Sequence, residues 1–307
     1  MGMQAESMRM SRGAPLHDRA AAPSRLWKWG GVAALLGIGL WVRTVPAGAL
    51  LPVGWQATTP VNLYFANGSF LFPVSRRFHP GNELPRVVLE ALLAGPRHSR
   101  TVDSVIPNDV KIRSFSVAAG VARIDLSGGI GEDDHAPMAL AEITETMTRV
   151  PGIGSVAVSV RGRPLQAAGE RTPLLYFPSA DGLVAVPSQA GDARAALDAY
   201  LSGPPSAGMT GVPADVRLLT YDYDTRDRLL SIGFTYTPAV RTLALEKPER
   251  TRMLLLGLIA SLTEFPGVRA VRLDFGGQSR LGLGECSDLL RSPQTRPALL
   301  NDERLLD

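Results

Sequence analysis

The chain has 307 residues and a formal net charge of +3, with 45% hydrophobic and 20% charged residues. These proportions are those of an ordinary globular protein and argue against long-range disorder, while the length suits about two domains of roughly 100 residues better than one small core. The basic excess is small and lies near the N-terminus, which argues against a nucleic-acid-binding surface. The single cysteine, Cys286, cannot form an internal disulfide bond, and no Cys/His cluster has the spacing of zinc ligands.

Residues 26–42 form an apolar run with one charge, Lys28, at its edge. The run is at the lower limit of length for spanning a bilayer. Trp27, Trp29 and Trp41 bracket it, as expected for indoles at the two membrane interfaces. By the positive-inside rule, the basic residues before the run place the N-terminus in the cytoplasm and the bulk of the chain outside the membrane. These basic residues are Arg9, Arg12, Arg19 and Arg25.

The membrane anchor has two alternatives. A cleaved signal peptide is one, because Ala47-Gly48-Ala49 offers small residues in an A-x-A arrangement after the apolar run. Arg43 argues against it, since a charge between the apolar core and the cleavage site is unusual. A buried core helix is the other, but it would not explain the flanking tryptophans and the one-sided basic flank. We therefore predict a single-pass membrane protein with a cytoplasmic tail at 1–25, a transmembrane signal anchor at 26–45 and a linker at 46–60.

The rest of the chain is an internal repeat. Residues 62–73 and 174–187 each read as strand, tight turn, strand. A helix follows in both copies and ends at Gly95-Pro96 and Gly203-Pro204, where glycine accepts the left-handed conformation and proline cannot continue the helix. Two predicted β-hairpins come next, introduced by Ile106-Pro107 in the first copy and Val212-Pro213 in the second; they span 111–126 and 217–234.

Each copy closes with a second helix and a strand. The helices, at 137–149 and 248–264, are followed by Pro151-Gly152 and Pro266-Gly267. Alternating apolar residues then predict strands with one buried face, at 156–160 and 271–275. The second copy carries extra residues at 235–247.

The order in each copy is therefore β-β-α-β-β-α-β, an α/β (α+β) domain with a mixed sheet and two helices on one face. We predict a first domain at 61–167, a second at 172–283 and a C-terminal extension at 284–307 with a short helix near 299–306.

These signatures resemble the GerMN domain of sporulation and spore germination proteins. The resemblance rests on the motifs at 63–65, 92–96, 106–107, 121–127 and 150–156, whose sequences are Leu-Tyr-Phe, Leu-Leu-Ala-Gly-Pro, Ile-Pro, Val-Ala-Arg-Ile-Asp-Leu-Ser and Val-Pro-Gly-Ile-Gly-Ser-Val. The second copy keeps Leu-Tyr-Phe, Ser-Gly-Pro and Phe-Pro-Gly-Val but has Leu-Leu-Ser-Ile-Gly-Phe-Thr at 229–235. The resemblance implies a relative of the ring-building modules of bacterial envelope machines, with a role in spore envelope assembly or germination and with protein partners. It implies no catalytic residues.

Asp125 and the acidic run 132–135 suggest chemistry, but structural roles explain them more simply. Asp125 is interpreted as a turn-bonding acid at a strand end. Glu132, Asp133, Asp134 and His135 lack the spacing of a calcium loop, and Asp133 or Asp134 is expected to cap the following helix.

Histidines, cysteine and aromatic residues give no site either. His17, His79 and His98 are scattered without partner spacing, and Cys286 is interpreted as an ordinary surface or packed cysteine. Six aromatic residues of the opening strands are expected to fill the two domain cores; they are Tyr64, Phe65, Phe70, Phe72, Tyr176 and Phe177. We therefore predict no catalytic, cofactor or metal residues.

Two functions follow. The first is a membrane-anchored, non-enzymatic interaction protein of the bacterial envelope that organises an extracytoplasmic complex in sporulation or spore germination, with envelope proteins or further copies of itself, as an oligomer or ring, for partners. The alternative is a module that binds peptidoglycan or spore cortex, or a weak cell-wall hydrolase, which would need an aromatic groove or two facing carboxylates.

Overall fold

The computed structural model describes residues 57–97, 102–130, 134–276 and 283–306. The predicted cytoplasmic tail and transmembrane anchor, and the linker up to residue 56, lie outside this part of the chain. Among the helices that the structure does describe, none has the length and apolar character needed to cross a bilayer.

Both repeats contain the predicted elements in the predicted order. The first has β1 (Thr59–Asn67), β2 (Phe70–Phe78), α2 (Leu84–Leu93), β3 (Ile112–Ala118), β4 (Val121–Leu126), α3 (Ala136–Met147) and β5 (Ser155–Val160), followed by an additional strand, β6 (Arg163–Glu170). The second has β7 (Leu174–Pro178), β8 (Leu183–Pro187), α4 (Ala193–Leu201), β9 (Leu218–Asp224), β10 (Leu229–Phe234), α5 (Pro238–Glu246), α6 (Pro248–Leu262) and β11 (Ala270–Phe275). The extra residues of the second repeat form the short helix α5.

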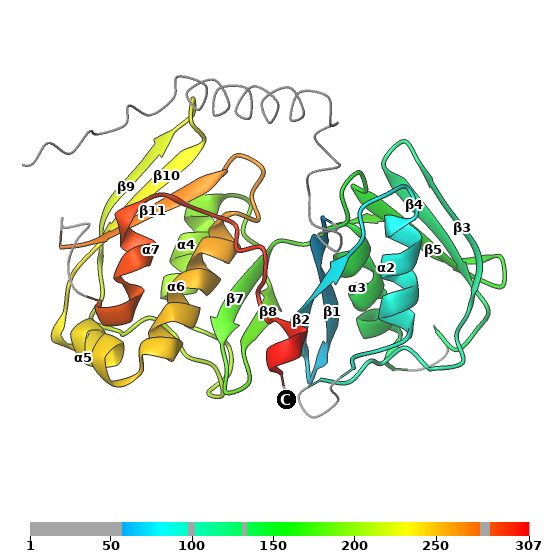
Figure 1. Cartoon of the computed structure of the whole chain (residues 1–307), viewed down its shortest axis with the longest axis horizontal. Helices are drawn as coiled ribbons and strands as arrows, with labels where there is room; N and C mark the ends of the chain where they lie inside the picture. Colours follow the sequence, from blue (N-terminus) through cyan, green and yellow to red (C-terminus); the bar gives the residue numbers. More distant parts are fainter. Residues whose placement is uncertain (1–56, 98–101, 131–133, 277–282, 307) are drawn as a thin grey trace, which may run out of the picture. The chain divides into compact units, whose positions relative to one another are not determined.

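The strands form three sheets rather than the predicted one mixed sheet per repeat. Two outer sheets, β3-β4-β5-β6 and β12-β11-β10-β9, are mixed, because β4 pairs with β5 and β10 pairs with β11 in parallel while the other pairs are antiparallel. The opening hairpins do not join them. They meet each other in a central sheet with the order β1-β2-β8-β7, half from each repeat (Figure 1).

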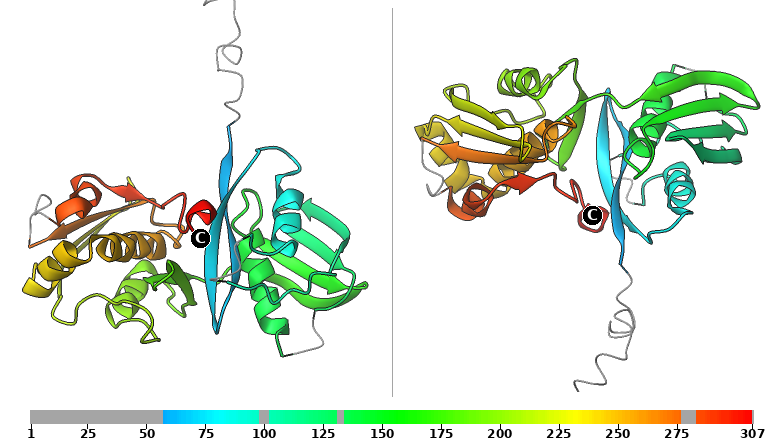
Figure 2. Two further views of the ribbon diagram at one scale, coloured as in Figure 1. Left: turned by 60° about the horizontal axis from the view of Figure 1, so that its bottom comes forward. Right: turned by 90° about the horizontal axis from the view of Figure 1, so that it is seen from above.

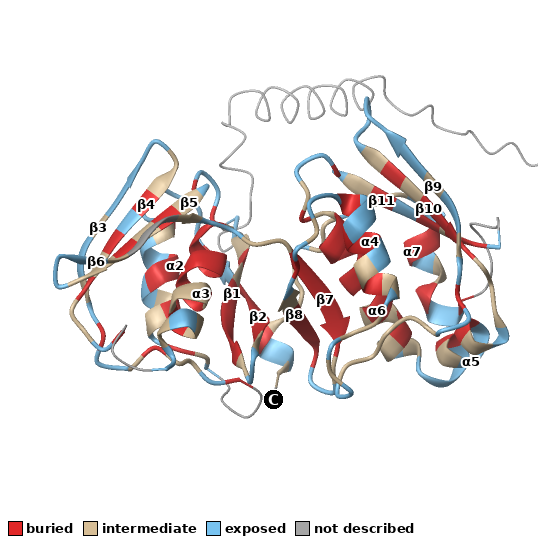
Figure 3. Ribbon diagram, turned by 180° about the vertical axis from the view of Figure 1, so that it is seen from behind, coloured by how far each residue is buried: buried red, intermediate tan, exposed pale blue. Residues whose placement is uncertain are grey.

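The hairpins leave their own sheets because both of their faces are apolar. On β1, Leu63 and Phe65 face the core of the first repeat, whereas Tyr64 belongs to a separate cluster at the seam between the repeats. On β7, Phe177 faces the second core and Tyr176 the same seam. Since successive side chains of a strand point to opposite faces, such a hairpin must be covered on both sides. Figure 3 shows the buried residues of these strands at the centre of the described part.

Helices separate the central sheet from the outer sheets. α3 contacts β1 on one side and β5 on the other, and α6 lies in the same way between β7 and β11. Each outer sheet is therefore covered by a helix of its own repeat on the side toward the central sheet. The helix ends also follow the prediction, because Gly95 after α2 and Gly203 after α4 have φ of 79° and 96° and each precedes a proline.

The C-terminal extension packs along both repeats. Its elements are η2 (Gly284–Ser287), α7 (Asp288–Arg291), β12 (Gln294–Thr295) and η3 (Glu303–Leu305). The predicted helix at 299–306 is present only as the single 3-10 turn η3, which contacts β2 of the first repeat. Figure 2 shows the red C-terminal segment against the β1–β2 hairpin in both views.

Candidate functional site at the seam between the repeats

The seam between the repeats is built around two tyrosines in equivalent positions. Tyr64 and Tyr176 are the central residues of the two Leu-Tyr-Phe motifs, both are fully buried, and their hydroxyl oxygens lie 2.8 Å apart. The expectation that all aromatic residues of the opening strands fill the two domain cores is wrong for these two. They form a third core instead, packed with Leu71, Leu174, Leu183, Ala185 and Ala260.

Hydroxyl groups from the helices complete the outer edges of the central sheet. The Tyr64 N–H donates to Thr146 Oγ1 of α3 at 2.9 Å, and the Tyr176 N–H donates to Ser261 Oγ of α6 at 2.8 Å. Thr146 and Ser261 occupy equivalent positions, each five residues before a Pro-Gly pair. Because β1 and β7 are the edge strands of this sheet, these bonds satisfy backbone donors that have no neighbouring strand.

The two repeats differ about one helical turn before Thr146 and Ser261, at Glu142 and Gly257. Glu142 of α3 accepts hydrogen bonds from Ala66 N at 2.8 Å, Ser104 Oγ at 3.0 Å and Val105 N at 3.3 Å. Gly257 stands at the matching position of α6, where a Cβ atom would collide with the carbonyl oxygen of Tyr176. The glycine therefore allows α6 to approach β7 closely.

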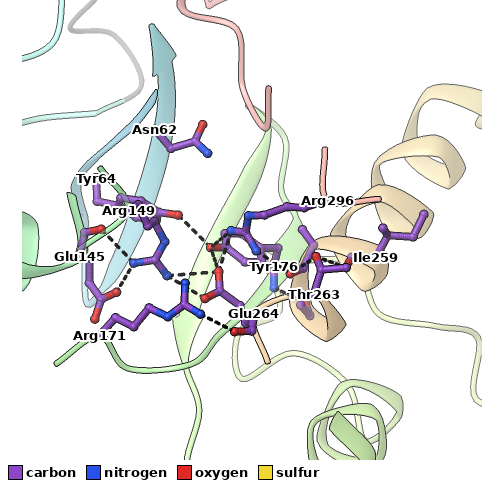
Figure 4. Close-up of polar contacts among 12 residues, drawn as sticks. Asn62, Tyr64, Glu145, Arg149, Arg171, Tyr176, Ile259, Thr263, Glu264 and Arg296 are labelled. Carbon is purple, nitrogen blue, oxygen red and sulfur yellow. Dashed lines mark hydrogen bonds and ion pairs between the residues drawn. The ribbon is translucent and has the colours of Figure 1, made fainter. Parts of the chain in front are cut away.

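An ion-pair network crosses the seam. Arg149 and Glu264 also occupy equivalent positions, each two residues before its Pro-Gly pair, and Arg149 Nη2 lies 3.1 Å from Glu264 Oε2. Arg149, two residues past the end of α3, also pairs with Glu145 of that helix. Arg296 of the C-terminal extension donates to Glu264 Oε1 at 2.6 Å and to the Tyr176 hydroxyl at 2.9 Å. Figure 4 shows these side chains converging on Glu264.

Aromatic rings and backbone groups complete the network. The Arg149 guanidinium lies 4.5 Å from the centre of the Tyr64 ring, and that of Arg296 lies 5.4 Å from the Tyr176 ring. The Tyr176 hydroxyl donates to Glu264 Oε1 at 2.6 Å, and Arg171 Nη2 donates to the Glu264 carbonyl oxygen at 2.8 Å. The Nε atom of Arg149 has no hydrogen-bond partner among the described residues.

The surroundings shift the pKa values of the buried acids in opposite directions. Burial opposes ionisation of Glu264, but the cations Arg149 and Arg296 and the Tyr176 hydroxyl outweigh it and hold its pKa at about 2. No cation is among the causes at Glu142, where burial raises the pKa to about 7 despite the three hydrogen bonds it accepts. Burial also raises the pKa of Tyr64 and of Tyr176. The seam carboxylate is thus held ionised, and both tyrosines are held neutral.

The sequence matches the family described as Germane, Sporulation and spore germination, over residues 62–166 and again over residues 174–280. The chain belongs to this family. The two matched ranges cover both repeats, so each repeat is a GerMN domain, and the resemblance read from the short motifs is confirmed.

One solved structure has the same fold over most of the chain, and two others are similar to smaller parts of it. The tandem GerMN domains of the sporulation protein GerM from Bacillus subtilis are 16% identical, with a TM-score of 0.58 over 80% of this chain and 99% of that chain. The first GerMN domain of the same protein is 19% identical over 36% of this chain and 86% of that one, with a TM-score of 0.30. A putative lipoprotein from Clostridium perfringens is 20% identical over 38% of this chain and 90% of its own, with a TM-score of 0.28. None of the curated proteins compared with this chain matches it.

In the GerMN repeats, the acids singled out from the sequence have different surroundings. Asp125 accepts from Gly162 N at 2.8 Å and Ser159 Oγ at 2.9 Å and pairs with Arg113, so it fastens the turn after β5, and the Gly162 bond lowers its pKa. Glu132 and Asp133 lie outside the described residues. The predicted capping of α3 by Asp134 is wrong, because the N-cap residue is His135, whose side chain makes no capping hydrogen bond.

The remaining candidates stay apart from one another. His79 and His135 are exposed, whereas His17 and His98 lie outside the described residues. Cys286 is fully buried, its thiol donates to the Pro248 carbonyl oxygen at 3.4 Å, and burial raises its pKa. Within the described ranges, no group of three or more His, Cys, Asp or Glu residues could hold a metal ion.

Sequence reasoning missed the seam of the GerMN pair altogether. One signal was present, because Arg149 and Glu264 are opposite charges at matching positions, directly before the Pro-Gly pairs that align the two repeats. Opposite charges at equivalent positions of a duplicated domain are the pattern expected where the copies meet across an approximate twofold axis. Arg296 gave no such signal, since it lies outside the repeat.

Proposed function

We propose that this GerMN protein is a membrane-anchored, non-enzymatic interaction protein of the bacterial envelope that organises an extracytoplasmic complex in sporulation or spore germination. Three features support this proposal: the family, the predicted anchor, and the pairing of the buried charges with one another at the seam. The partners are envelope proteins, including further copies of the same chain. The observation that carries the proposal is the edge of β3, which is uncharged from Ser114 to Ala118 and has no neighbouring strand on its outer side among the described residues.

β3 has no neighbouring strand on its outer side within the described part of the chain. Ala118 and Val121 flank the two-residue turn Ala119-Gly120 and form a hydrogen-bonded pair with each other. The alternation of an antiparallel ladder then directs the N–H and C=O groups of Phe115 and Val117 outward. These groups form a ready edge for a further strand.

The equivalent strand of the second repeat is protected. β9 has the same pattern of exposure as β3, but it carries Asp222 and Asp224. Charged side chains on an edge strand hinder pairing with another chain. β3 has one charged residue, Arg113, near its start. The residues after it are uncharged, and Val117 among them is 41% exposed. The first repeat therefore presents the edge that accepts a partner strand.

Other features favour an interaction role over chemistry on glycans. Tyr64, Phe65, Phe72, Tyr176 and Phe177 are buried, so they provide no platform for a sugar ring. An apolar hollow in the second repeat, next to Tyr200, Phe234 and Leu258, has no charged residue among those that line it. General acid–base hydrolysis needs two carboxyl groups facing one accessible site, whereas Glu264 and Glu145 are buried against arginines.

A photo-crosslinking amino acid on the β3 edge tests this proposal. It replaces Val117 in one variant and Leu245 of α5, which is 62% exposed, in a matched control, and both variants are illuminated in membranes of the host. We expect discrete crosslinked proteins from position 117 only, and a Ser116→Lys substitution should remove them by placing a charge on the edge. Equal crosslinking from both positions, or none from position 117, would contradict the proposal.

A further inference from the structure

The C-terminal segment 300–303 lies along β2 as a short added strand. Ser75 N donates to the Asn301 carbonyl oxygen at 2.7 Å, Leu300 N donates to Ser75 Oγ at 2.9 Å, and Ser75 forms a parallel bridge with Asp302. β2 and β8 pair at one position, Leu71 with Ala185. The segment therefore occupies backbone groups of β2 that β8 leaves unpaired.

Asn301 joins the two repeats where β2 and β8 diverge. Its side-chain Nδ2 donates to the Pro73 carbonyl oxygen at 2.7 Å and to the Leu183 carbonyl oxygen at 2.9 Å, while Oδ1 accepts from Leu183 N at 2.8 Å. The carboxamide thus supplies the donor and the acceptor that a paired strand would have supplied. A carboxylate could accept but not donate, so the site selects an amide.

Glu303 binds to Arg76 and to the backbone of Arg97 in the first repeat. Its two carboxylate oxygens accept from Arg76 Nη2 and Nε, both at 2.5 Å, and Oε1 also accepts from Arg97 N at 3.2 Å. Arg76 is fixed from behind by the carbonyl oxygens of Ala91 and Gly95. Each side chain of this pair is only 6% exposed. A bidentate arginine in this geometry selects a carboxylate.

The segment has the character of a bound peptide rather than of a domain element. It lies outside both ranges matched by the family. It combines directional polar bonds to the first repeat with apolar packing of Leu300 and of the following Leu306, while Leu305 is 81% exposed. A groove remains open beside it, between β2 and α2, next to Arg77, Val87 and Arg97. Before the segment, Arg296 is anchored on the second repeat, where it donates to the Ala260 carbonyl oxygen at 2.9 Å, so residues 297–299 connect this anchor to the segment.

We propose that the groove occupied by residues 300–303, along β2 and Arg76, is a binding site for an extended segment that carries an amide followed two residues later by a carboxylate. Two copies of the chain exchange their C-terminal segments through this groove. The connection at 297–299 is the hinge. Exchange between copies forms in trans the same bonds that the chain makes in cis, which makes it a low-cost route to a dimer. This inference does not depend on the edge of β3, which is a different surface.

Cis binding dominates in dilute solution, because the short connection gives the segment an effective concentration in the millimolar range. Exchange becomes the main state when the copies are crowded or when one copy has lost its own segment. That second condition provides the experiment.

Two full-length variants, purified in detergent, test the contributions of the groove and of the segment one at a time. The segment variant carries Asn301→Ala and Glu303→Ala with an intact groove, and the groove variant carries Arg76→Met with an intact segment. When the two are given different tags and mixed, we expect them to purify together, whereas two preparations of the same variant do not. A fluorescent peptide of residues 294–307 should bind the segment variant about tenfold or more tightly than it binds the unmodified chain, whose own segment competes, and should not bind the groove variant.

A folded segment variant that neither pairs with the groove variant nor binds the peptide would overturn the proposal. Hydrogen exchange of the unmodified chain provides a test that does not depend on the variants folding. We expect the amides of Ser75, Leu183 and Arg97, which donate to the segment, to exchange faster than the Tyr64 amide of the central sheet. Equal exchange rates would mean that the segment leaves only when the protein unfolds, and would also overturn the proposal.

Discussion

Tyr64 and Tyr176 occupy the same position in their repeats and share a hydrogen bond of 2.8 Å, but only the Tyr176 hydroxyl also contacts Glu264 and Arg296. Tyr64→Phe removes one neutral hydrogen bond and should lower the free energy of unfolding by about 1 kcal/mol. Tyr176→Phe removes a bond to a buried carboxylate as well, and should cost about 2 to 3 kcal/mol. Urea denaturation of both variants measures the difference. Equal losses would mean that the bond to Glu264 adds nothing.

Among the described residues, Glu264 is the carboxylate that both Arg149 and Arg296 contact at the seam. Glu264→Gln should lower the free energy of unfolding by about 3 to 5 kcal/mol, because the buried guanidinium of Arg149 and the partly buried one of Arg296 lose their shared counterion. Asp198→Asn, which breaks the exposed pair with Arg194 on α4, is the matched control and should cost no more than about 0.5 kcal/mol.

A double-mutant cycle with Arg149→Met distinguishes coupling across the seam from general damage. The double variant should lose less than the sum of the single variants, because removing both partners leaves no unpaired charge at that contact. Strict additivity would show that Arg149 and Glu264 act independently, despite their separation of 3.1 Å.

Acid should weaken the seam in a defined pH window. The folded-state pKa of Glu264, about 2, lies below the value of 4.5 for an unperturbed glutamate. Its contribution to stability is therefore present above pH 4.5 and is lost as the pH falls toward 2, by on the order of 3 kcal/mol. Denaturation of the unmodified chain and of Glu264→Gln across this window measures it. We expect the two stability curves to converge as the pH falls.

Glu142 should give the opposite trend near neutral pH. Because its folded-state pKa of about 7 is raised above 4.5, folding favours the protonated form, so this stabilisation is complete below pH 4.5 and is lost as the pH rises through 7. Relative to the unmodified chain, Glu142→Gln should gain stability between pH 5 and pH 8 by up to about 3 kcal/mol. A difference that stays constant over this range would contradict the raised pKa.

The close approach of α6 to β7 depends on Gly257. Gly257→Ala places a methyl group against the Tyr176 carbonyl oxygen, and neither helix nor strand backbone can yield cheaply. We expect a loss of about 1 to 3 kcal/mol in the free energy of unfolding. Gly191→Ala is a control, because its added carbon atom would meet open space. Its effect should stay within about 0.5 kcal/mol.

The local elements were predictable because their signals are local. Gly95-Pro96 and Gly203-Pro204 end helices by their own conformational preferences, and the alternation at Val156 and Val158 marks a strand with one buried face. The family was predictable for a related reason, since short motifs in a fixed order appear twice.

The central sheet and the seam were not predictable in the same way. β1 has a buried face on each side, and the sequence does not say whether its own repeat or the other one covers the second face. The bond of Tyr64 to Tyr176 and the pair of Arg149 with Glu264 join residues far apart in the chain, so no local pattern specifies them. Asn301 and Glu303 lie in a segment whose mixed composition indicated only an extension, because their partners belong to the other end of the molecule.

The opposite charges of Arg149 and Glu264 have a consequence for how the two repeats can be combined. A chimera with two first repeats would bring two arginines together at the twofold position, and a chimera with two second repeats would bring two glutamates together. The first arrangement leaves each arginine only Glu145 of its own repeat, and the second leaves the two glutamates to share Arg296, so the two copies are not interchangeable. The two repeats are therefore complementary, because the charge at this position of each repeat favours the other repeat as its neighbour over a second copy of itself.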